Sequence, residues 1–189
     1  MQSAPSSGVS TNFTYDSQDV AQDKTSTGTI TEYLNGPGID NKIRQKTGTT
    51  LYYFAQDHLG STTALTDSKG ALLERQTYDA YGNSTGSTRT RYGYTGRERD
   101  SLTGLLYYRA RSYGPQIGRF ISEDPIGFQG GDVNIYAYVA NSPVNFSDPS
   151  GQWSTAAHNE IIEQAFRFCL TESQRKRLKD AQQICRQSR

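Results

Sequence analysis

Residues 124–152 read DPIGFQGGDVNIYAYVANSPVNFSDPSGQ, and this stretch begins and ends with the same short motif. Asp-Pro-x-Gly is typical of a tight turn, because the Asp side chain bonds nearby backbone, Pro fixes its own φ and Gly accepts a positive φ. A polar and aromatic run separates the two copies, and the composition changes after the second. The stretch therefore predicts a β-rich scaffold that ends near residue 152 and is joined to a different segment.

Two upstream runs, NFTYDSQDV at 12–20 and QTYDAYGN at 76–83, each contain a Tyr-Asp pair followed by a turn. Short runs punctuated by Gly, Asn and Asp favour a sheet built of β-hairpins. Sustained helical periodicity is absent from the sequence before residue 150. We predict strands at Thr29–Leu34, Leu51–Gln56, Thr62–Thr66, Leu72–Asp79, Thr88–Tyr94, Gly104–Tyr108, Arg109–Tyr113 and Asn134–Tyr138.

The composition indicates an unusual core. Only 33% of the 189 residues are hydrophobic, the mean hydropathy is −0.75, and the chain has 13 Tyr and 18 Gly. Aromatic pairs across neighbouring strands can replace part of an aliphatic core. Residues 1–152 contain 13 Lys and Arg against 15 Asp and Glu, whereas residues 153–189 contain 7 against 4. The sign of the charge thus changes after residue 152, which we take as a boundary.

The basic tail has a helical pattern. Apolar residues between His158 and Leu170 recur at the spacing of an amphipathic helix. Thr171 then opens the sequence Thr-Glu-Ser-Gln, a capping box that predicts a second helix. Cys169 and Cys185 are expected on the apolar helix faces rather than in a disulfide. Two short helices form a hairpin and not a domain, so we expect a truncated region.

Four landmarks occur in a fixed order along the chain: YFAQDHLGS at 53–61, YDAYGN at 78–83, YTGRERD at 94–100 with GLLYYRAR at 104–111, and GRFISEDPIG at 118–127 leading to DPSG at 148–151. In this order they closely resemble the Rhs (YD-repeat) proteins and their Rhs-repeat-associated core domain. The resemblance covers roughly residues 12–152. Gly114 stands where many relatives have an acidic residue, and Phe128 and Gln152 stand where they commonly have Leu.

The resemblance implies a mainly β fold, a partial cocoon of YD hairpins with a short α-helical hairpin at its C-terminus. It divides the chain into a disordered edge (1–11), YD-repeat hairpins (12–100), the Rhs-associated core (101–152) and a truncated helical toxin or variable region (153–189). Members of this family enclose a C-terminal toxin region. Many also act as aspartyl proteases that cut their own chain just after the second motif.

Carried onto this sequence, the resemblance implies that Asp124 and Asp148 are the catalytic pair and that the cut falls between Gln152 and Trp153. Two neighbouring carboxyl groups can share the work of activating a water and polarising a carbonyl. Arg119, Gly127 and Gly151 are the expected supporting residues. The same motifs also fit ordinary turns with no chemistry, and both interpretations stay open.

Other sites are not expected. His58 and His158 have no metal-ligand spacing around them, so we predict neither a metal nor a cofactor. The basic run 175–179 lacks interleaved aromatics and is interpreted as a solvated helix face, so no nucleic acid is expected. The sequence has no apolar run long enough to span a bilayer and no signal peptide at its start.

The leading hypothesis is a C-terminal Rhs core fragment of a bacterial polymorphic toxin, which sheathes its own C-terminal region and cleaves itself. The resemblance implies secretion through a specialised system, commonly type VI, and partners of the full-length parent such as an immunity protein and a secretion adaptor. The alternative is a non-cleaving YD-repeat module that acts as a cell-surface or interaction scaffold. Whether the chain is an enzyme therefore stays open at the level of sequence.

Overall fold

The computed structural model describes residues 9–84, 87, 89–130, 132–152, 171–174 and 176. The chain divides into two compact units, Met1–Leu106 and Tyr107–Arg189. The predicted edge at 1–11 lies largely outside the described residues, as does most of the tail after residue 152. Each unit is described below by itself.

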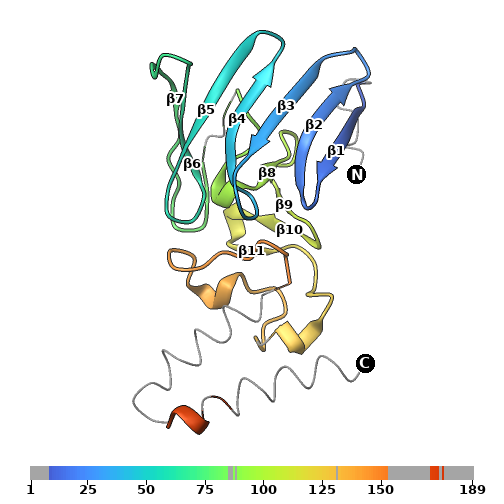
Figure 1. The fold of residues 1–189 in the computed structure, drawn as a ribbon. Helices are drawn as coiled ribbons and strands as arrows, with labels where there is room; N and C mark the ends of the chain where they lie inside the picture. Colours follow the sequence, from blue (N-terminus) through green and yellow to red (C-terminus); the bar gives the residue numbers. More distant parts are fainter. Residues whose placement is uncertain are drawn as a thin grey trace. The chain divides into compact units, whose positions relative to one another are not determined.

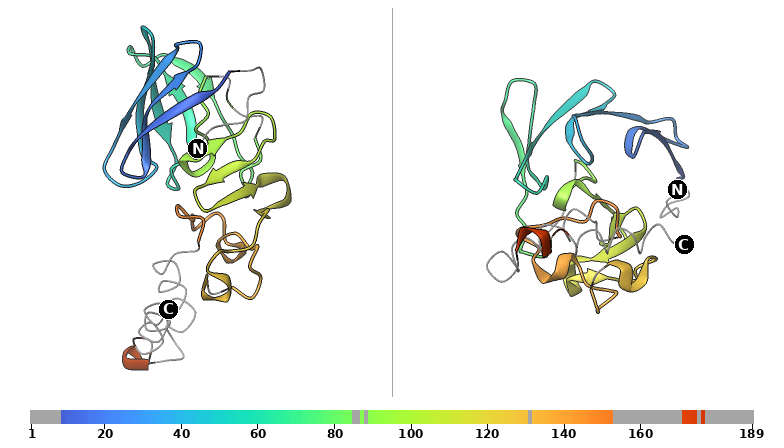
Figure 2. Two further views of the ribbon diagram at one scale, coloured as in Figure 1. Left: turned by 90° about the vertical axis from the view of Figure 1, so that its right-hand side faces the viewer. Right: turned by 60° about the horizontal axis from the view of Figure 1, so that its bottom comes forward.

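The first unit is built on one antiparallel sheet of seven strands that follow one another in chain order (Figure 1). Short loops join consecutive strands, as Figure 2 shows from two further directions. The strands are β1 (Thr11–Asp16), β2 (Asp19–Thr25), β3 (Ile30–Asn35), β4 (Lys42–Thr47), β5 (Thr50–Gln56), β6 (Thr62–Thr66) and β7 (Leu72–Arg75). This order confirms the predicted hairpin meander.

Several strands of this sheet bury polar side chains rather than apolar ones. β4 has the sequence KIRQKT, and its buried residues are Lys42 and Gln45. β2 buries Asp19, Val20 and Asp23. Buried polar groups must find partners within the protein, so this face is held together by hydrogen bonds and ion pairs as well as by tyrosines.

Two strand predictions in this unit were wrong in part. β7 ends at Arg75 and not at Asp79. The described residues of the predicted strand 88–94 contribute one isolated bridge, Tyr92 to Glu98, and a 3-10 turn then begins at Tyr94. Backbone φ is positive at Thr95 and Gly96, so the chain turns directly after Tyr94. The short strand β8 (Glu98–Arg99) follows this turn.

The second unit has a small sheet in which β9 (Leu106–Tyr108), β10 (Arg111–Gly114) and β11 (Arg119–Phe120) are neighbours. Four fully buried rings pack together beside it, with centroids 4.5–5.7 Å apart. They belong to Tyr108, Tyr113, Phe120 and Tyr138. Such pairs add about 0.5–1.5 kcal/mol each beyond the burial of their area. The core of this unit is therefore aromatic, as the composition predicted.

The segment Asn134–Tyr138 was predicted to be a strand, and this prediction was wrong. The Asn134 side chain accepts a hydrogen bond from the Tyr136 amide at 3.1 Å, and Ala137 forms only an isolated bridge with Arg119. Three residues with positive φ follow, Val139 to Asn141. The side chain of Asn134 thus competes for the backbone, and the segment becomes a series of turns.

The predicted capping box in the tail is present. The Gln174 amide donates to the Thr171 hydroxyl at 3.4 Å, and the Thr171 amide donates to the Gln174 side-chain oxygen at 2.9 Å. Residues 172–174 are helical. The predicted first tail helix lies outside the described residues, as does the rest of the second helix except residue 176.

Candidate functional site

A single type of turn recurs through the chain. In Asp67-Ser-Lys-Gly70-Ala71 the Asp67 carboxylate accepts hydrogen bonds from the third and fifth amides at 2.8 and 2.9 Å. Gly70 has φ of +80° and donates its amide to the Asp67 carbonyl. The turns that begin at Asp57 and Asp79 repeat this pattern. Asp-x-x-Gly turns therefore close the β5–β6 and β6–β7 hairpins, and another follows β7.

The two Asp-Pro-x-Gly motifs are versions of the same turn. Gly127 donates its amide to the Asp124 carbonyl at 2.8 Å, and Gly151 donates to the Asp148 carbonyl at 3.2 Å. Both glycines have positive φ, +55° and +67°. One carboxylate oxygen, Oδ1, of each Asp accepts a hydrogen bond from its own turn, as in the hairpins.

The two motif turns differ from the turns at Asp57 and Asp79 in how deeply the Asp side chain is buried. Asp148 is fully buried and Asp124 is 7% exposed, whereas Asp57 and Asp79 are exposed. The second oxygen of each motif Asp, Oδ2, therefore cannot rely on solvent and needs a partner in the protein.

That partner is Arg111, at the start of β10. Its Nη2 lies 3.0 Å from Asp124 Oδ2 and 3.2 Å from Asp148 Oδ2. The guanidinium side chain is only 1% exposed. The two carboxylates, 24 residues apart in sequence, thus meet at one nitrogen atom. The meeting of Asp124 and Asp148 was predicted from the motifs, whereas the arginine between them was not.

The other two nitrogen atoms of Arg111 also donate hydrogen bonds. Nε donates to the Gly151 carbonyl at 2.5 Å, and Nη1 donates to the Ile135 carbonyl at 3.1 Å. The Phe120 ring covers the guanidinium, whose central carbon is 3.5 Å from the ring centroid. Burial lowers the pKa of Arg111, and the charges of Asp124 and Asp148 oppose this shift. One buried cation therefore balances part of the charge of two buried anions.

The second motif packs closely against the end of β9 and the turn that leads into β10. A Cβ atom on Gly151 would overlap the Tyr108 carbonyl oxygen, so only glycine permits this approach. The Arg109 guanidinium donates to the Pro149 carbonyl, and the Ala110 amide donates to the Ser150 carbonyl. For the first motif, the Asp124 amide donates to the Ile135 carbonyl at 3.0 Å.

The other predicted site residues fall into three groups. Gly127 and Gly151 lie in the turns, as expected, and the Gln152 amide is 3.1 Å from Asp148 Oδ1. Arg119 is exposed and lies over the Tyr136 ring at 5.9 Å, so the guanidinium at the carboxylates is that of Arg111 instead. Trp153 lies outside the described residues.

A small cavity adjoins the pair. It measures about 10 Å³ and is lined by Arg111 and Asp124, together with Gly127, Gly130, Asp132, Asn134, Ile135, Ala137 and Ala140. A cavity of about 10–15 Å³ holds one water molecule when polar groups line it. The first motif therefore has room for a single water beside its carboxylate.

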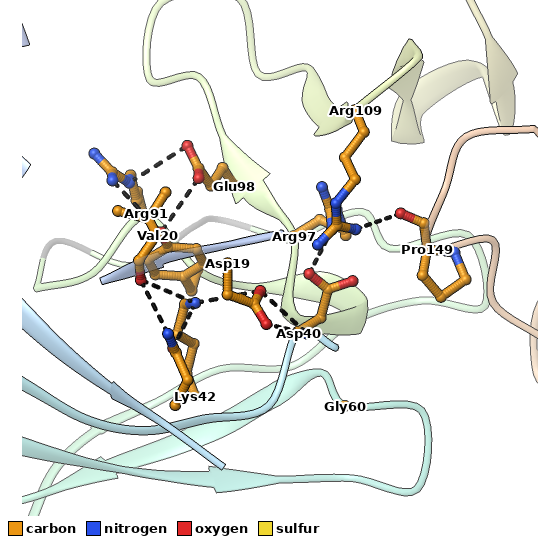
Figure 3. Close-up of polar contacts among 12 residues, drawn as sticks. Asp19, Val20, Asp40, Lys42, Gly60, Arg91, Arg97, Glu98, Arg109 and Pro149 are labelled. Carbon is orange, nitrogen blue, oxygen red and sulfur yellow. Dashed lines mark hydrogen bonds and ion pairs between the residues drawn. The ribbon is translucent and has the colours of Figure 1, made fainter. Parts of the chain in front are cut away.

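The first unit holds a separate cluster of buried charges (Figure 3). Lys42 Nζ lies 3.5 Å from Asp19 Oδ1 and donates to Asn35 Oδ1 at 2.7 Å. Burial lowers the pKa of Lys42, and the nearby Asp19 and Asp40 charges oppose that shift. Arg97 pairs with Asp40 at 2.5 Å. Each cation in this cluster has acceptors, so the cluster holds the strands together.

Neither unit offers an obvious metal or membrane site in the part of the chain that the structure describes. Over these residues no group of three or more His, Cys, Asp or Glu side chains could hold a metal ion. Across the same residues no helix is both long and apolar enough to cross a bilayer.

Comparison with known proteins gives a consistent result. The family model of the Teneurin YD-shell matches residues 42–144, more than half of the chain. The tRNA3(Ser)-specific nuclease WapA of Bacillus spizizenii is 35% identical over 173 residues, which is 75% of this chain and 7% of that protein. The toxin protein Tse5 of Pseudomonas aeruginosa is 38% identical over 106 residues, covering 53% of this chain and 8% of that protein.

Solved structures agree with these relatives. The TcdB2-TccC3-TEV crystal structure superposes with a TM-score of 0.61 at 26% identity, covering 79% of this chain and 8% of that chain. A Photorhabdus luminescens Tc holotoxin pore gives a TM-score of 0.63 at 26% identity with the same coverage. The chain spans less than a tenth of the length of these relatives. It belongs to the YD-repeat (Rhs-type) family, and the part that matches is the Teneurin YD-shell.

Proposed function

We propose that this chain is the C-terminal shell segment of a toxin-related Rhs protein and that it cuts its own backbone just after the second motif. The single observation that supports this most is the meeting of Asp124 and Asp148 at Arg111. Turn formation alone does not require it, because the turns at Asp57 and Asp79 form around exposed aspartates. The reaction would be hydrolysis of the Gln152–Trp153 peptide bond.

The geometry suggests a role for each group. Asp148 Oδ1 accepts a hydrogen bond from the Gln152 amide at 3.1 Å and would hold the residue before the cut in place. Asp124 and Arg111 line a cavity that fits one water, which supports Asp124 as the group that would accept the proton when a water attacks the Gln152 carbonyl carbon. The Arg111 guanidinium would balance the negative charge that develops on the carbonyl oxygen. The proton then passes to the departing Trp153 amine as the carbon–nitrogen bond breaks. One water is consumed, and an acid and an amine are formed.

The product would be a shell that still holds its C-terminal region. Two relatives are named as a toxin and a tRNA nuclease, which supports a toxin context for the segment that follows residue 152. We propose that residues 153–189 belong to that passenger. Secretion and encounters with an immunity protein or an adaptor would then be properties of the longer parent.

A second candidate is a scaffold that does not cleave. Asp124, Asp148 and Arg111 also form a complete ion-paired network, which by itself would stabilise the second unit. This alternative predicts a chain of unchanged length after expression and storage.

Intact-mass spectrometry of the purified chain and of Asp124→Asn and Asp148→Asn distinguishes the two. Self-cleavage predicts a fragment ending at Gln152 in the unaltered chain and a single uncut species in both variants. Asn keeps the shape of Asp but cannot accept a proton from water at neutral pH. An Asp79→Asn variant, altered in the Asp-x-x-Gly turn that follows β7 in the first unit, serves as the matched control and should cleave normally. Cleavage that persists in both motif variants would refute the proposed catalytic pair.

A further inference from the structure

The second motif differs from the other turns at its third position. In the turns at Asp67 and Asp79, and in the first motif, the Asp carboxylate accepts a hydrogen bond from the main-chain amide of the third residue. In the second motif a side chain takes this place, because the Ser150 hydroxyl donates to Asp148 Oδ1 at 3.0 Å. The residue in this position therefore affects the buried carboxylate directly.

The same hydroxyl also contacts the residue that precedes the proposed cut. The Gln152 amide donates to Ser150 Oγ at 3.1 Å and to Asp148 Oδ1 at 3.1 Å. Ser150 thus links the Asp148 carboxylate to the main chain of Gln152. On the other side, Arg111 Nε holds the Gly151 carbonyl at 2.5 Å. The peptide unit between Gly151 and Gln152 is fixed at both its oxygen and its nitrogen.

The Gln152 side chain takes no part in this arrangement. Among the described residues its amide group makes no hydrogen bond, and the residue is half-buried. Recognition at this position therefore uses the backbone, which every residue except proline supplies in the same form. The side chain at position 152 is free to vary.

We infer that Ser150 is a positioning residue for self-cleavage and that the enzyme recognises the main-chain amide of Gln152 rather than its side chain. This inference rests on the proposed function. The carbonyl group of Gln152 belongs to the same residue as the amide that Ser150 and Asp148 hold. Hydrolysis requires this carbonyl to stay close to the attacking water. The Gln152 amide has two acceptors, Ser150 Oγ and Asp148 Oδ1. Removing the Ser150 hydroxyl should let this amide rotate, so cleavage should slow although Asp124, Asp148 and Arg111 are unchanged.

Position 150 allows a matched test, because Thr and Val have nearly the same shape and only Thr carries the hydroxyl. Each variant is made by cell-free synthesis, and the fraction of cut chain is followed over time by gel and by mass. Ser150→Thr should cleave within about twofold of the unaltered chain, and Ser150→Val about tenfold more slowly, as expected for one hydrogen bond to a charged group. Equal rates for Thr and Val would overturn the role of Ser150.

Substitutions at residue 152 test the second half of the inference. Gln152→Leu and Gln152→Ala should cleave at the rate of the unaltered chain, whereas Gln152→Pro, which lacks the amide hydrogen, should not cleave. A rate that changes by tenfold or more between Leu and Ala would show that the side chain is recognised. If the unaltered chain is never cut, both the proposed function and this inference fail. Thermal unfolding of every variant shows that each has folded.

Discussion

Arg111 joins the two motifs through three of its own nitrogen atoms. It contacts Asp124 and Asp148 through Nη2, Gly151 through Nε and Ile135 through Nη1. This role could not be predicted from the sequence, because Arg111 lies 13 residues before the first motif among several other arginines. Arg119, which is closer in sequence to that motif, was the natural candidate. Only the folded arrangement of the second unit shows that Arg111, and not Arg119, contacts the two carboxylates.

Replacing Arg111 by Met should cost about 3–5 kcal/mol of unfolding free energy, because it leaves two buried carboxylates without their cation. Arg119→Met is the matched control, and removing its exposed side chain should change the stability by less than about 1 kcal/mol. Urea denaturation of both variants measures the difference. Equal losses would contradict the assignment of Arg111 as the central cation.

The two motif glycines should differ in their tolerance of a side chain. Gly127→Ala meets open space and carries only the cost of a positive φ, about 1–2 kcal/mol. Gly151→Ala carries that cost and also overlaps the Tyr108 carbonyl, which adds about 1–3 kcal/mol. Comparing the urea midpoints of the two variants tests this, and a Gly127 variant that is the less stable would contradict the described packing.

At the level of elements, apolar and aromatic strands were predictable and polar strands were not. The predicted strand at Thr62–Thr66 matches β6, and Leu51–Gln56 matches β5 to within one residue. β2 and β4 were missed as strands, because DVAQDKT and KIRQKT lack a continuous alternation of apolar and polar residues. Their inward residues are Asp, Lys and Gln, which become suitable for a core only once distant partners such as Asn35 are in place.

The hairpin turns should make stability depend on pH in a predictable direction. The hydrogen bond from the Ala71 amide, followed by that from Lys69, lowers the pKa of Asp67. A carboxyl group whose pKa is lower in the folded state stabilises the fold above its unfolded pKa of about 3.9 and loses that contribution as the pH falls through its folded value.

Asp67→Asn should therefore lose less stability than the unaltered chain when the pH falls from neutral into this acidic range. Urea midpoints measured at neutral and acidic pH provide the comparison. Ser68→Ala, in the same turn but without a titrating group, is the control and should follow the unaltered chain. An identical pH dependence for Asp67→Asn would show that this carboxylate makes no pH-dependent contribution.

For the whole molecule, the site lies within one compact unit, so self-cleavage should occur within a single chain. Mixing Asp124→Asn with Asp148→Asn chains should give no cut product, because neither variant contains both carboxylates in one site. The fraction cut in the unaltered chain should also follow first-order kinetics at every protein concentration. A rate that rises with concentration, or cleavage restored by mixing, would indicate that one chain cuts another.

The two distant motif turns meet at a buried arginine, and we propose that they make one hydrolytic site there. The most direct measurement is the mass of the unaltered chain, followed from synthesis until the distribution is constant. Self-cleavage should replace the single species by two fragments, one ending at Gln152 and the other beginning at Trp153, whose summed mass exceeds that of the chain by one water. A single species of 21.0 kDa that persists unchanged would contradict it and leave only a structural role for the buried pair.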